Sequence, residues 1–391
     1  KLAQYGDYLY LYILLLSFIP AIILGIKGKN NKYYGILLSI LMVGIIVGTG
    51  KYNMLLFIMF VVGEFTVIYS YLFIRRKTDN KIIFYLALLA SMLPVIITKT
   101  SVLTKFGPIG FIGLSYLNFK AIQMIIEIYD GAIKEVKFIT LVYFIIFFPT
   151  LSSGPIDRYR RFEEDLNKTI EKKGYLDDYL YIGIRKIIIG LGYKFVLAYI
   201  INTMWMSKIP ADITFLNGLN YMYAYSMYLF FDFAGYSLMA VGSSNILGIQ
   251  TPMNFNKPFL SVDIKDFWTR WHITLSTWLR DFVFSRVLMQ VIRKKWFKNR
   301  LHNATYAYMV NMLVMGFWHG LSVSYIVYGF YHGILMAGFE VYQKKSNFYK
   351  KNKNKNWYKL LSWFVTMHLV LIGFFIFSGE PYKILLTILK R

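Results

Sequence analysis

The sequence contains no cysteine among its 391 residues. Disulfides, thiolate metal sites and a cysteine nucleophile are therefore excluded for this chain. Acidic residues are also scarce, with 20 Asp and Glu against 44 Lys and Arg, and the formal net charge is +24. Histidine occurs only five times, so each one can be weighed separately as a candidate for proton chemistry. The sequence also lacks HExxH, GxSxG and Walker patterns, the signatures of common zinc, serine and nucleotide sites.

Apolar residues, in contrast, make up 57% of the sequence, which exceeds the roughly one half that is typical of soluble proteins. Apolar runs of about 17–25 residues recur, and each is long enough to cross a bilayer. The Lys and Arg residues cluster between these runs, as expected of loops that face anionic lipid headgroups. The sequence therefore predicts a multi-pass protein of the cell membrane. Its positive charge is expected to interact with anionic lipid headgroups and not with nucleic acid.

We predict an all-α polytopic membrane protein with about eleven transmembrane helices and some short re-entrant or interfacial helices. The first span, residues 8–26, is too long for a signal-peptide core and lacks a small-residue cleavage signature, so we expect a retained helix. Basic residues within 27–32, 75–81 and 344–359 place these three loops in the cytoplasm. The predicted spans are 8–26, 33–50, 53–74, 81–98, 108–129, 136–151, 182–203, 216–240, 304–318, 321–343 and 357–378.

Two stretches interrupt this pattern of spans. Residues 154–181 are charged and amphipathic, which is typical of a segment that lies on the membrane surface. Residues 241–300 are too polar for simple spans and too aromatic for a free loop, so we expect short helices that line a wet cavity or are buried in protein. We predict a single domain, 1–391, with three parts: N-terminal helices (1–152), a core that holds both candidate histidines (153–340), and a basic loop with the last helix (341–391).

Two histidines lie in segments that are otherwise apolar. His272 follows Trp268 and Trp271, and His319 follows Trp318 directly. An ionisable side chain at membrane depth is costly, so it is a functional candidate by default, and imidazole suits proton transfer near neutral pH. A core histidine bonded to a neighbouring helix would explain His319 equally well, and a wet histidine in an aromatic interfacial belt would explain His272.

The other ionisable candidates are weaker. A structural role is favoured for His332 and His368, and His302 follows a basic run that indicates a solvated side chain. Asp232 lies in an apolar segment and needs a partner, which we expect to be an arginine from 270–286. We predict no metal site, because no carboxylate or second histidine stands at ligand spacing from these histidines.

Several longer motifs resemble the membrane-bound O-acyltransferase family. They extend from about residue 153 to about 333: SGPI at 153–156, DFAGYS at 232–237, NFNKPF at 254–259, DFWTRWH at 266–272, WLRD at 278–281 and GFWHG at 316–320. The run FVFSRVL at 282–288 departs from the branch of alginate-type O-acetyltransferases. With the stretch that begins at Gly154, it is similar to the branch that transfers D-alanine in Gram-positive cell-wall synthesis.

The resemblance implies a ring of transmembrane helices around a central tunnel. It implies that D-alanine arrives as a phosphopantetheine thioester on an acidic cytoplasmic carrier protein, with no cofactor bound to the chain itself. The product is an ester on a hydroxyl of lipoteichoic acid outside the cell, and small membrane accessory subunits are further candidate partners. His319 matches the family's catalytic histidine, and His272 matches a histidine that lines the same passage.

We therefore predict that His319 is the general base and that His272 orients the thioester or stabilises its oxyanion. The residues predicted to line the substrate tunnel are Trp268, Trp271, Arg270, Trp318 and Asp232. The stretch 283–300 is predicted to dock the carrier, or alternatively to lie on anionic lipid. Its candidate contacts are Arg286, Val287, Leu288, Met289, Val291, Ile292, Arg293 and Lys294.

Three alternative functions remain open at this point. An alginate-type polysaccharide O-acetyltransferase uses similar motifs. A transporter or flippase of cell-wall precursors would also have broken helices and buried charges, although we see no paired inverted halves in this sequence. A scaffold for cell-wall enzymes would not depend on either histidine.

Overall fold

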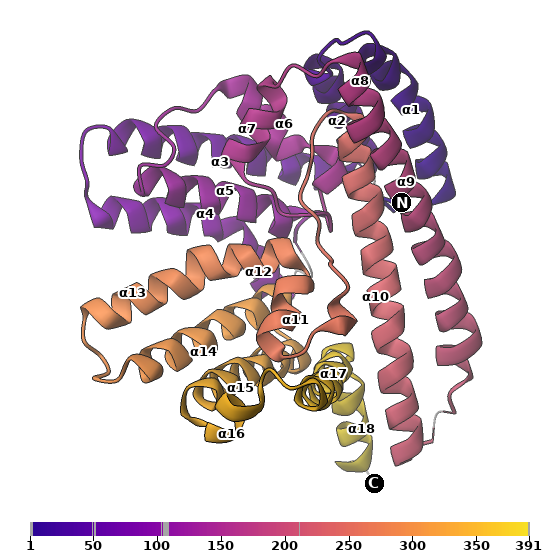
Figure 1. Cartoon of the computed structure of the whole chain (residues 1–391). Helices are drawn as coiled ribbons and strands as arrows, with labels where there is room; N and C mark the ends of the chain where they lie inside the picture. The colour runs from indigo at the N-terminus through magenta and orange to yellow at the C-terminus, as the bar shows by residue number, and fades with distance from the viewer. Residues whose placement is uncertain are drawn as a thin grey trace. The chain divides into compact units, whose positions relative to one another are not determined.

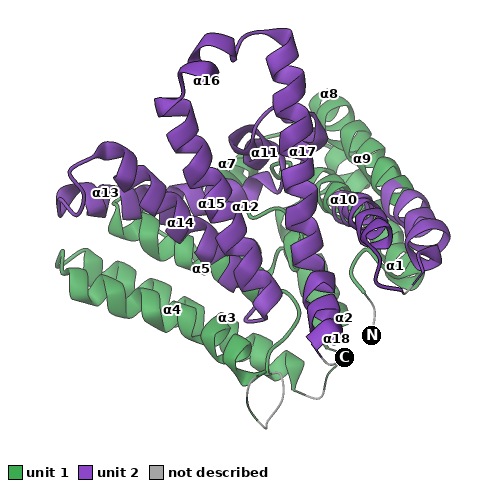
Figure 2. Ribbon diagram, turned by 90° about the horizontal axis from the view of Figure 1, so that it is seen from below, with its two compact units in different colours: residues 1–192, 235–253 green, residues 193–234, 254–391 purple. Residues whose placement is uncertain are grey.

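The computed structural model describes residues 3–389 except for 49, 51, 103, 105–108 and 211. Residue 108, where one predicted span begins, therefore lies outside the described residues. The described residues form helices and no strands, and they divide into two compact units (Figure 2). Unit 1 holds residues 1–192 and 235–253, and unit 2 holds residues 193–234 and 254–391. The division into the three parts expected from the sequence stays a prediction.

Unit 1 is built from helices of the N-terminal half of the chain, together with the end of a long later helix. They are α1 (Tyr8–Ile26), α2 (Lys32–Val47), α3 (Asn53–Arg75), α4 (Lys81–Ser101), α5 (Leu114–Tyr129), α6 (Phe138–Ile146), α7 (Tyr159–Asn167), α8 (Lys172–Gly174), the π-helix η2 (Tyr175–Tyr181) and α9 (Ile182–Leu191). A 3-10 turn, η1 (Phe148–Thr150), follows α6. Side chains cap two of the apolar helices: Asp7 accepts from the Leu9 N–H, and Asn80 accepts from the Ile82 N–H.

Helices α3, α4 and α5 lie side by side within unit 1 (Figure 1). A buried polar cluster joins them, because Glu64 of α3 accepts hydrogen bonds from Ser91 of α4 at 2.7 Å and from Asn118 of α5 at 3.2 Å. The Glu64 side chain is almost fully buried. A polar group in an apolar interior is tolerated when its hydrogen bonds are satisfied, so this carboxyl group has a structural role.

Unit 2 contains the helices of the C-terminal half. They are η3 (Gly192–Ala198, whose first residue belongs to unit 1), η4 (Ile201–Trp205), η5 (Met206–Lys208), η6 (Pro258–Leu260), α11 (Ile264–Arg270), α12 (Ile273–Leu279), η7 (Arg280–Phe284), α13 (Ser285–Arg293), α14 (Arg300–His319), α15 (Val323–Lys345), α16 (Asn347–Asn352), α17 (Asn356–Ser378) and α18 (Glu380–Leu389). Helix α10 (Phe215–Ile246) is continuous from unit 2 into unit 1. The short helices α11 to α13 fall in the stretch 241–300, for which short helices were predicted.

Helices α14 and α15 pack closely because two glycines meet between them. A Cβ atom on Gly316 would lie 2.6 Å from the Tyr325 carbonyl oxygen, and one on Gly329 would lie 2.6 Å from the Met312 carbonyl oxygen. Neither position therefore accepts a larger residue without moving a backbone. This contact fixes the end of α14, and His319 is the last residue of that helix.

Within the described ranges, five helical segments are long and apolar enough to cross a membrane. They are Tyr8–Ile26, Asn53–Arg75, Lys81–Ser101, Lys172–Lys208 and Asn356–Ser378, and α2 is a shorter apolar helix. The predicted all-α membrane architecture is confirmed, whereas the number of about eleven spans stays a prediction. The segment Lys172–Lys208 begins ten residues before the predicted span at 182, because π-helical turns continue the helix through Tyr175–Tyr181.

Candidate active site

The backbone between α11 and α12 breaks at His272. His272 lies in the left-handed region, with φ 44° and ψ 51°, so the stretch forms two short helices and not one continuous helix. Two backbone hydrogen bonds hold the break: the Asn256 N–H donates to the Arg270 carbonyl at 3.0 Å, and the Ile273 N–H donates to the Asn254 carbonyl at 2.8 Å. The left-handed region is unfavourable for a residue with a Cβ atom, so these bonds must compensate for the strain.

Both candidate histidines line one cavity of about 50 Å³ in unit 2. His272 is 3% exposed and its ring lies 4.8 Å from that of Phe233 of α10. His319 is half-buried, and its ring lies 5.0 Å from that of Phe377 of α17. The cavity holds a few water molecules at most. The rest of its wall is apolar or aromatic: Leu229, Phe233, Trp268, Trp271, Leu275, Met315, Tyr328, Phe374 and Phe377.

The Nε2 atom of His272 is buried and has no hydrogen-bond partner among the described residues. Nearly all buried polar atoms in proteins are paired, so an unpaired one in a cavity wall indicates a group that a ligand or water satisfies. The two imidazoles therefore provide a hydrogen-bonding atom and a proton acceptor beside the same small space, in surroundings that are otherwise apolar. Such an arrangement suits a reaction in which a proton is removed and negative charge develops nearby.

A second cavity, of about 370 Å³, adjoins the first in unit 2. Trp268 and Met315 belong to the walls of both cavities, so these two side chains separate them. Two residues in the wall of the larger cavity carry a buried polar atom without a partner among the described residues, Nε1 of Trp268 and Oδ1 of Asn311. Lys265 in its wall is held by an ion pair with Glu340.

Two of the five predicted tunnel residues, Trp268 and Trp271, line the cavity that holds the histidines. The other three lie outside its wall. The guanidinium of Arg270 is held by Asp266, with Nε 2.7 Å from Oδ1. The ring of Trp318 lies 6.4 Å from that of His272.

The partner expected for Asp232 was wrong, since its carboxylate pairs with Lys194 and not with an arginine from 270–286. Lys194 belongs to the helical segment that precedes α10, and Asp232 lies on α10. The sequence offered no signal for this pair, because a lysine beside an apolar run also fits a loop at the membrane surface.

The remaining histidines have different surroundings. His368 is bonded through Nε2 to the Tyr223 hydroxyl at 2.7 Å and through Nδ1 to the Phe364 carbonyl at 2.8 Å, which gives it a structural role. His302 is exposed. The ring of His332 is fully buried against Trp268 and Tyr328, with centroids 5.1 and 4.6 Å away.

The predicted docking stretch is partly exposed. Met289 is 62% exposed and Ile292 is 50% exposed, and the basic side chains of Arg293 and Lys294 are exposed beside them. Val291 was a wrong choice for a docking contact, because it is 1% exposed inside unit 2. The other candidates, Arg286, Val287 and Leu288, are half-buried.

Sequence reasoning missed several residues of the histidine cavity. Phe233 is a neighbour of the predicted Asp232, but Phe374 and Phe377 belong to α17, far along the chain. Aromatic residues in an apolar span equally indicate contact with lipid, so no local signal separated them. Among the described residues, no group of three or more histidine, aspartate or glutamate side chains is placed to hold a metal ion.

Comparison with known proteins agrees with the family motifs. The membrane-bound O-acyltransferase family matches residues 51–379. The chain is 44% identical to the teichoic acid D-alanyltransferase of Bacillus subtilis over 97% of this chain and 99% of that protein. It is 39% identical to the enzyme of that name from Streptococcus thermophilus, over 97% and 95% of the two chains. A probable alginate O-acetylase of Pseudomonas syringae is 32% identical, over 69% of this chain and 49% of that protein. The chain therefore belongs to the membrane-bound O-acyltransferase family and is an acyltransferase of the membrane.

Proposed function

We propose that this acyltransferase moves D-alanine from a carrier-protein thioester to hydroxyl groups of lipoteichoic acid. The observation that carries the proposal is the pair His272 and His319 in one cavity, which shares a wall with a larger cavity. The names of the two relatives that align along nearly the whole chain support D-alanine as the acyl group and teichoic acid as the acceptor.

In this proposal His319 is the general base. The hydroxyl of the acceptor gives its proton to the neutral imidazole as its oxygen attacks the thioester carbonyl. The new C–O bond forms, the C–S bond breaks, and the thiol of the donor leaves with the proton that His319 returns. His272 supplies a hydrogen bond that orients the thioester or stabilises the oxyanion.

The larger cavity suits the donor arm. Pantetheine is a chain with two amide groups, and an amide needs hydrogen-bond partners when it leaves water. Trp268 and Asn311 line that cavity, and they carry an unpaired N–H and an unpaired carbonyl oxygen. The thioester end of such an arm reaches the histidines only if Trp268 or Met315 moves, since these side chains separate the two cavities.

We further propose that the exposed face of α13, with Met289, Ile292, Arg293 and Lys294, docks the carrier. Its positive charge complements an acidic protein and mainly raises the rate and selectivity of association. The apolar side chains at the centre of such a contact provide most of the binding energy. Small accessory membrane subunits complete the proposed set of partners.

The test is transfer of labelled D-alanine from the charged carrier to lipoteichoic acid by the purified chain in liposomes. We expect His319→Ala to lower the rate by about 10²–10⁴-fold. His302→Ala is the matched control, because His302 is exposed, and it should keep the normal rate. If His319→Ala folds normally and retains more than half of the transfer, the assignment of the base is wrong.

The same assay separates the alternative functions. A donor arm loaded with an acetyl group should be a poor substrate, and preference for acetyl over D-alanyl would favour an acetyltransferase. A transporter or scaffold would give no ester product when this chain is the sole membrane protein in the liposomes.

A further inference from the structure

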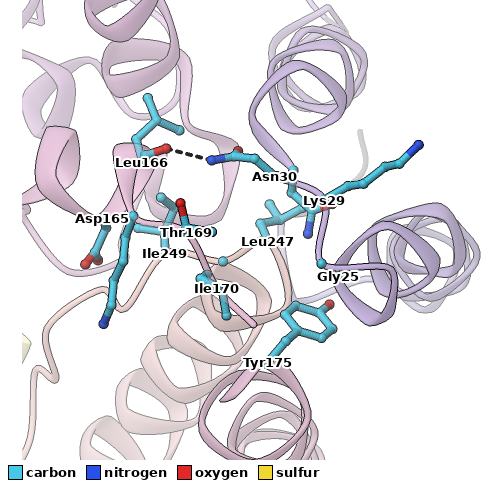
Figure 3. Close-up of a pocket in the computed structure, with 14 residues that line it drawn as sticks. Gly25, Lys29, Asn30, Asp165, Leu166, Thr169, Ile170, Tyr175, Leu247 and Ile249 are labelled. Atoms are coloured by element: carbon cyan, nitrogen blue, oxygen red, sulfur yellow. Dashed lines mark hydrogen bonds between the residues drawn. The ribbon is translucent and has the colours of Figure 1, made fainter. Parts of the chain in front are cut away.

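A third cavity, of about 270 Å³, lies in unit 1, whereas both candidate histidines belong to unit 2 (Figure 3). Three loops form it: residues 28–31 between α1 and α2, residues 168–170 between α7 and α8, and residues 247–249 after α10. The loops are tied together, because the Asn30 side chain donates to the Leu166 carbonyl at 2.8 Å and the Tyr175 hydroxyl donates to the Ile246 carbonyl at 2.9 Å. The cavity is thus preformed by bonds within unit 1.

The position of this cavity along α1 indicates how deep it lies in the membrane. The apolar span of α1 ends at Ile26, and Gly25 in its last turn belongs to the cavity wall. The next residues of the wall, from Gly28 onward, follow the span directly and include Lys29. Residues just beyond an apolar span lie at the level of the lipid headgroups. The basic residues of this loop favour the cytoplasmic side.

Asn31 gives the cavity an unsatisfied acceptor. Its side chain is 5% exposed, and its Nδ2 atom lies 3.4 Å from the Ile246 carbonyl oxygen. Its Oδ1 atom has no partner among the described residues. Asn31 occupies the N-cap position of α2, yet its side chain makes no capping bond. A buried carbonyl oxygen that neither caps its helix nor meets another donor is free to accept a hydrogen bond from a ligand.

The charge of the cavity is positive on balance. Lys29 and Lys168 contribute two exposed ammonium groups. Asp165 is the acidic residue of the wall, and its Oδ2 atom is already bonded to Arg161 at 2.7 Å and to the Gln250 N–H at 2.8 Å. The Lys29 side chain extends away from the cavity in Figure 3, and its flexible stem lets the ammonium group turn towards an anion at the rim.

We propose that this cavity binds the headgroup of an anionic phospholipid that carries both a phosphate and a free hydroxyl, as in phosphatidylglycerol. The phosphate lies at Lys29 and Lys168, and a glycerol hydroxyl donates to Oδ1 of Asn31. Basic pockets on the cytoplasmic side of membrane proteins bind anionic headgroups in this way. The hydroxyl contact distinguishes this headgroup from phosphatidic acid, which has no glycerol hydroxyl on its phosphate.

The experiment uses the purified, delipidated full chain in detergent, and it does not depend on transfer activity. Lipid affinity is measured by native mass spectrometry and by thermal unfolding with phosphatidylglycerol, phosphatidic acid, phosphatidylcholine or soluble glycerol phosphate. We expect phosphatidylglycerol to bind best. Replacing Lys29 or Lys168 by alanine should lower the affinity for both anionic lipids, by about fivefold for each lysine removed. Lys344→Ala with Lys345→Ala is the control, since both lysines are exposed in unit 2.

Asn31→Ala should abolish the preference for phosphatidylglycerol over phosphatidic acid while leaving the binding of phosphatidic acid unchanged. If Asn31→Ala does not fold, Thr169→Trp replaces it, because Thr169 is an exposed residue of the wall and a bulky ring there should exclude both lipids. The proposal is overturned if phosphatidylcholine binds as well as phosphatidylglycerol, or if neither Thr169→Trp nor the lysine variants weaken binding. If soluble glycerol phosphate binds as tightly as the lipid, the cavity is a site for a free metabolite and not for a lipid headgroup.

Discussion

His272 has a backbone conformation that costs about 1–2 kcal/mol in a residue with a Cβ atom. The hydrogen bonds with residues 254 and 256 hold the chain there, and the hydroxyl of Thr274 adds a bond to Oδ1 of Asn254 at 2.5 Å. As a result, the imidazole is placed at the start of α12 and in the wall of the cavity that also contains His319. The motif around Asn254 thus contributes to the site by shaping the backbone.

This geometry leads to a prediction at His272. Asparagine tolerates the left-handed region, so His272→Asn should keep the normal thermal stability of the chain and lose transfer activity. Valine does not tolerate that region, so His272→Val should also lower the free energy of unfolding, by about 1–2 kcal/mol. Thermal unfolding in detergent and the transfer assay check the two effects. Equal stability of the two variants would show that the strain is absent.

A second prediction concerns the unpaired amide of Asn311. Asn311→Leu should raise the KM for the thioester donor by about 2–10-fold, the value of one hydrogen bond, with a smaller effect on kcat. Asn303→Leu is a matched control on the same helix, because Asn303 is also buried with an unpaired Oδ1 atom and lies outside the wall of the larger cavity. Similar KM values for the two variants would contradict the assignment of Asn311 to the donor site.

At the scale of whole helices, the contact between α14 and α15 controls the position of His319. Gly329→Leu should force the two helices apart and lower the free energy of unfolding by about 1–3 kcal/mol, with loss of transfer. Gly338→Leu on the same helix is the control, because nothing lies within 4 Å of a Cβ atom at that position. Chemical unfolding and transfer rates check the prediction. A Gly329→Leu variant as stable and active as the wild type would contradict it.

The apolar spans explain how much of the fold could be predicted from sequence. The predicted span at 8–26 coincides with α1, and the one at 81–98 falls within α4, because an unbroken apolar run of sufficient length has few alternatives to a helix. The break at His272 could not be predicted, since it depends on hydrogen bonds to Asn254 and Asn256 in an earlier loop. The same limit applies to the ion pair of Asp232 with Lys194, which joins segments 38 residues apart.

For the candidate site, the family motifs located both histidines and two tryptophans of the cavity. They did not locate the aromatic residues of α17, because Phe374 and Phe377 lie in a span whose composition fits contact with lipid equally well. Periodicity identifies which segments form helices, whereas the choice between a lipid-facing and a cavity-facing side depends on packing with other helices.

At the scale of the whole molecule, the net charge of +24 favours association with acidic partners. Salt screens such attraction over about 10 Å at 0.1 M, so a rise in ionic strength should increase the KM for the protein carrier. Free D-alanyl-pantetheine thioester, which does not need the docking surface, should respond much less. Replacing Arg293 and Lys294 by glutamate should have the same effect as salt, whereas the same change at Lys344 and Lys345 should not. Equal salt dependence with the two donors would contradict carrier docking by charge.

The volume of the histidine cavity has a consequence for fidelity. A space of about 50 Å³ admits about three to five water molecules, and its aromatic wall offers them few partners. Water and the acceptor hydroxyl compete for the same activated acyl group, and the partition ratio between ester and free acid decides how many thioesters are wasted. A cavity this small limits the number of water molecules that can attack the acyl group, and an acceptor that displaces them removes the competing nucleophile.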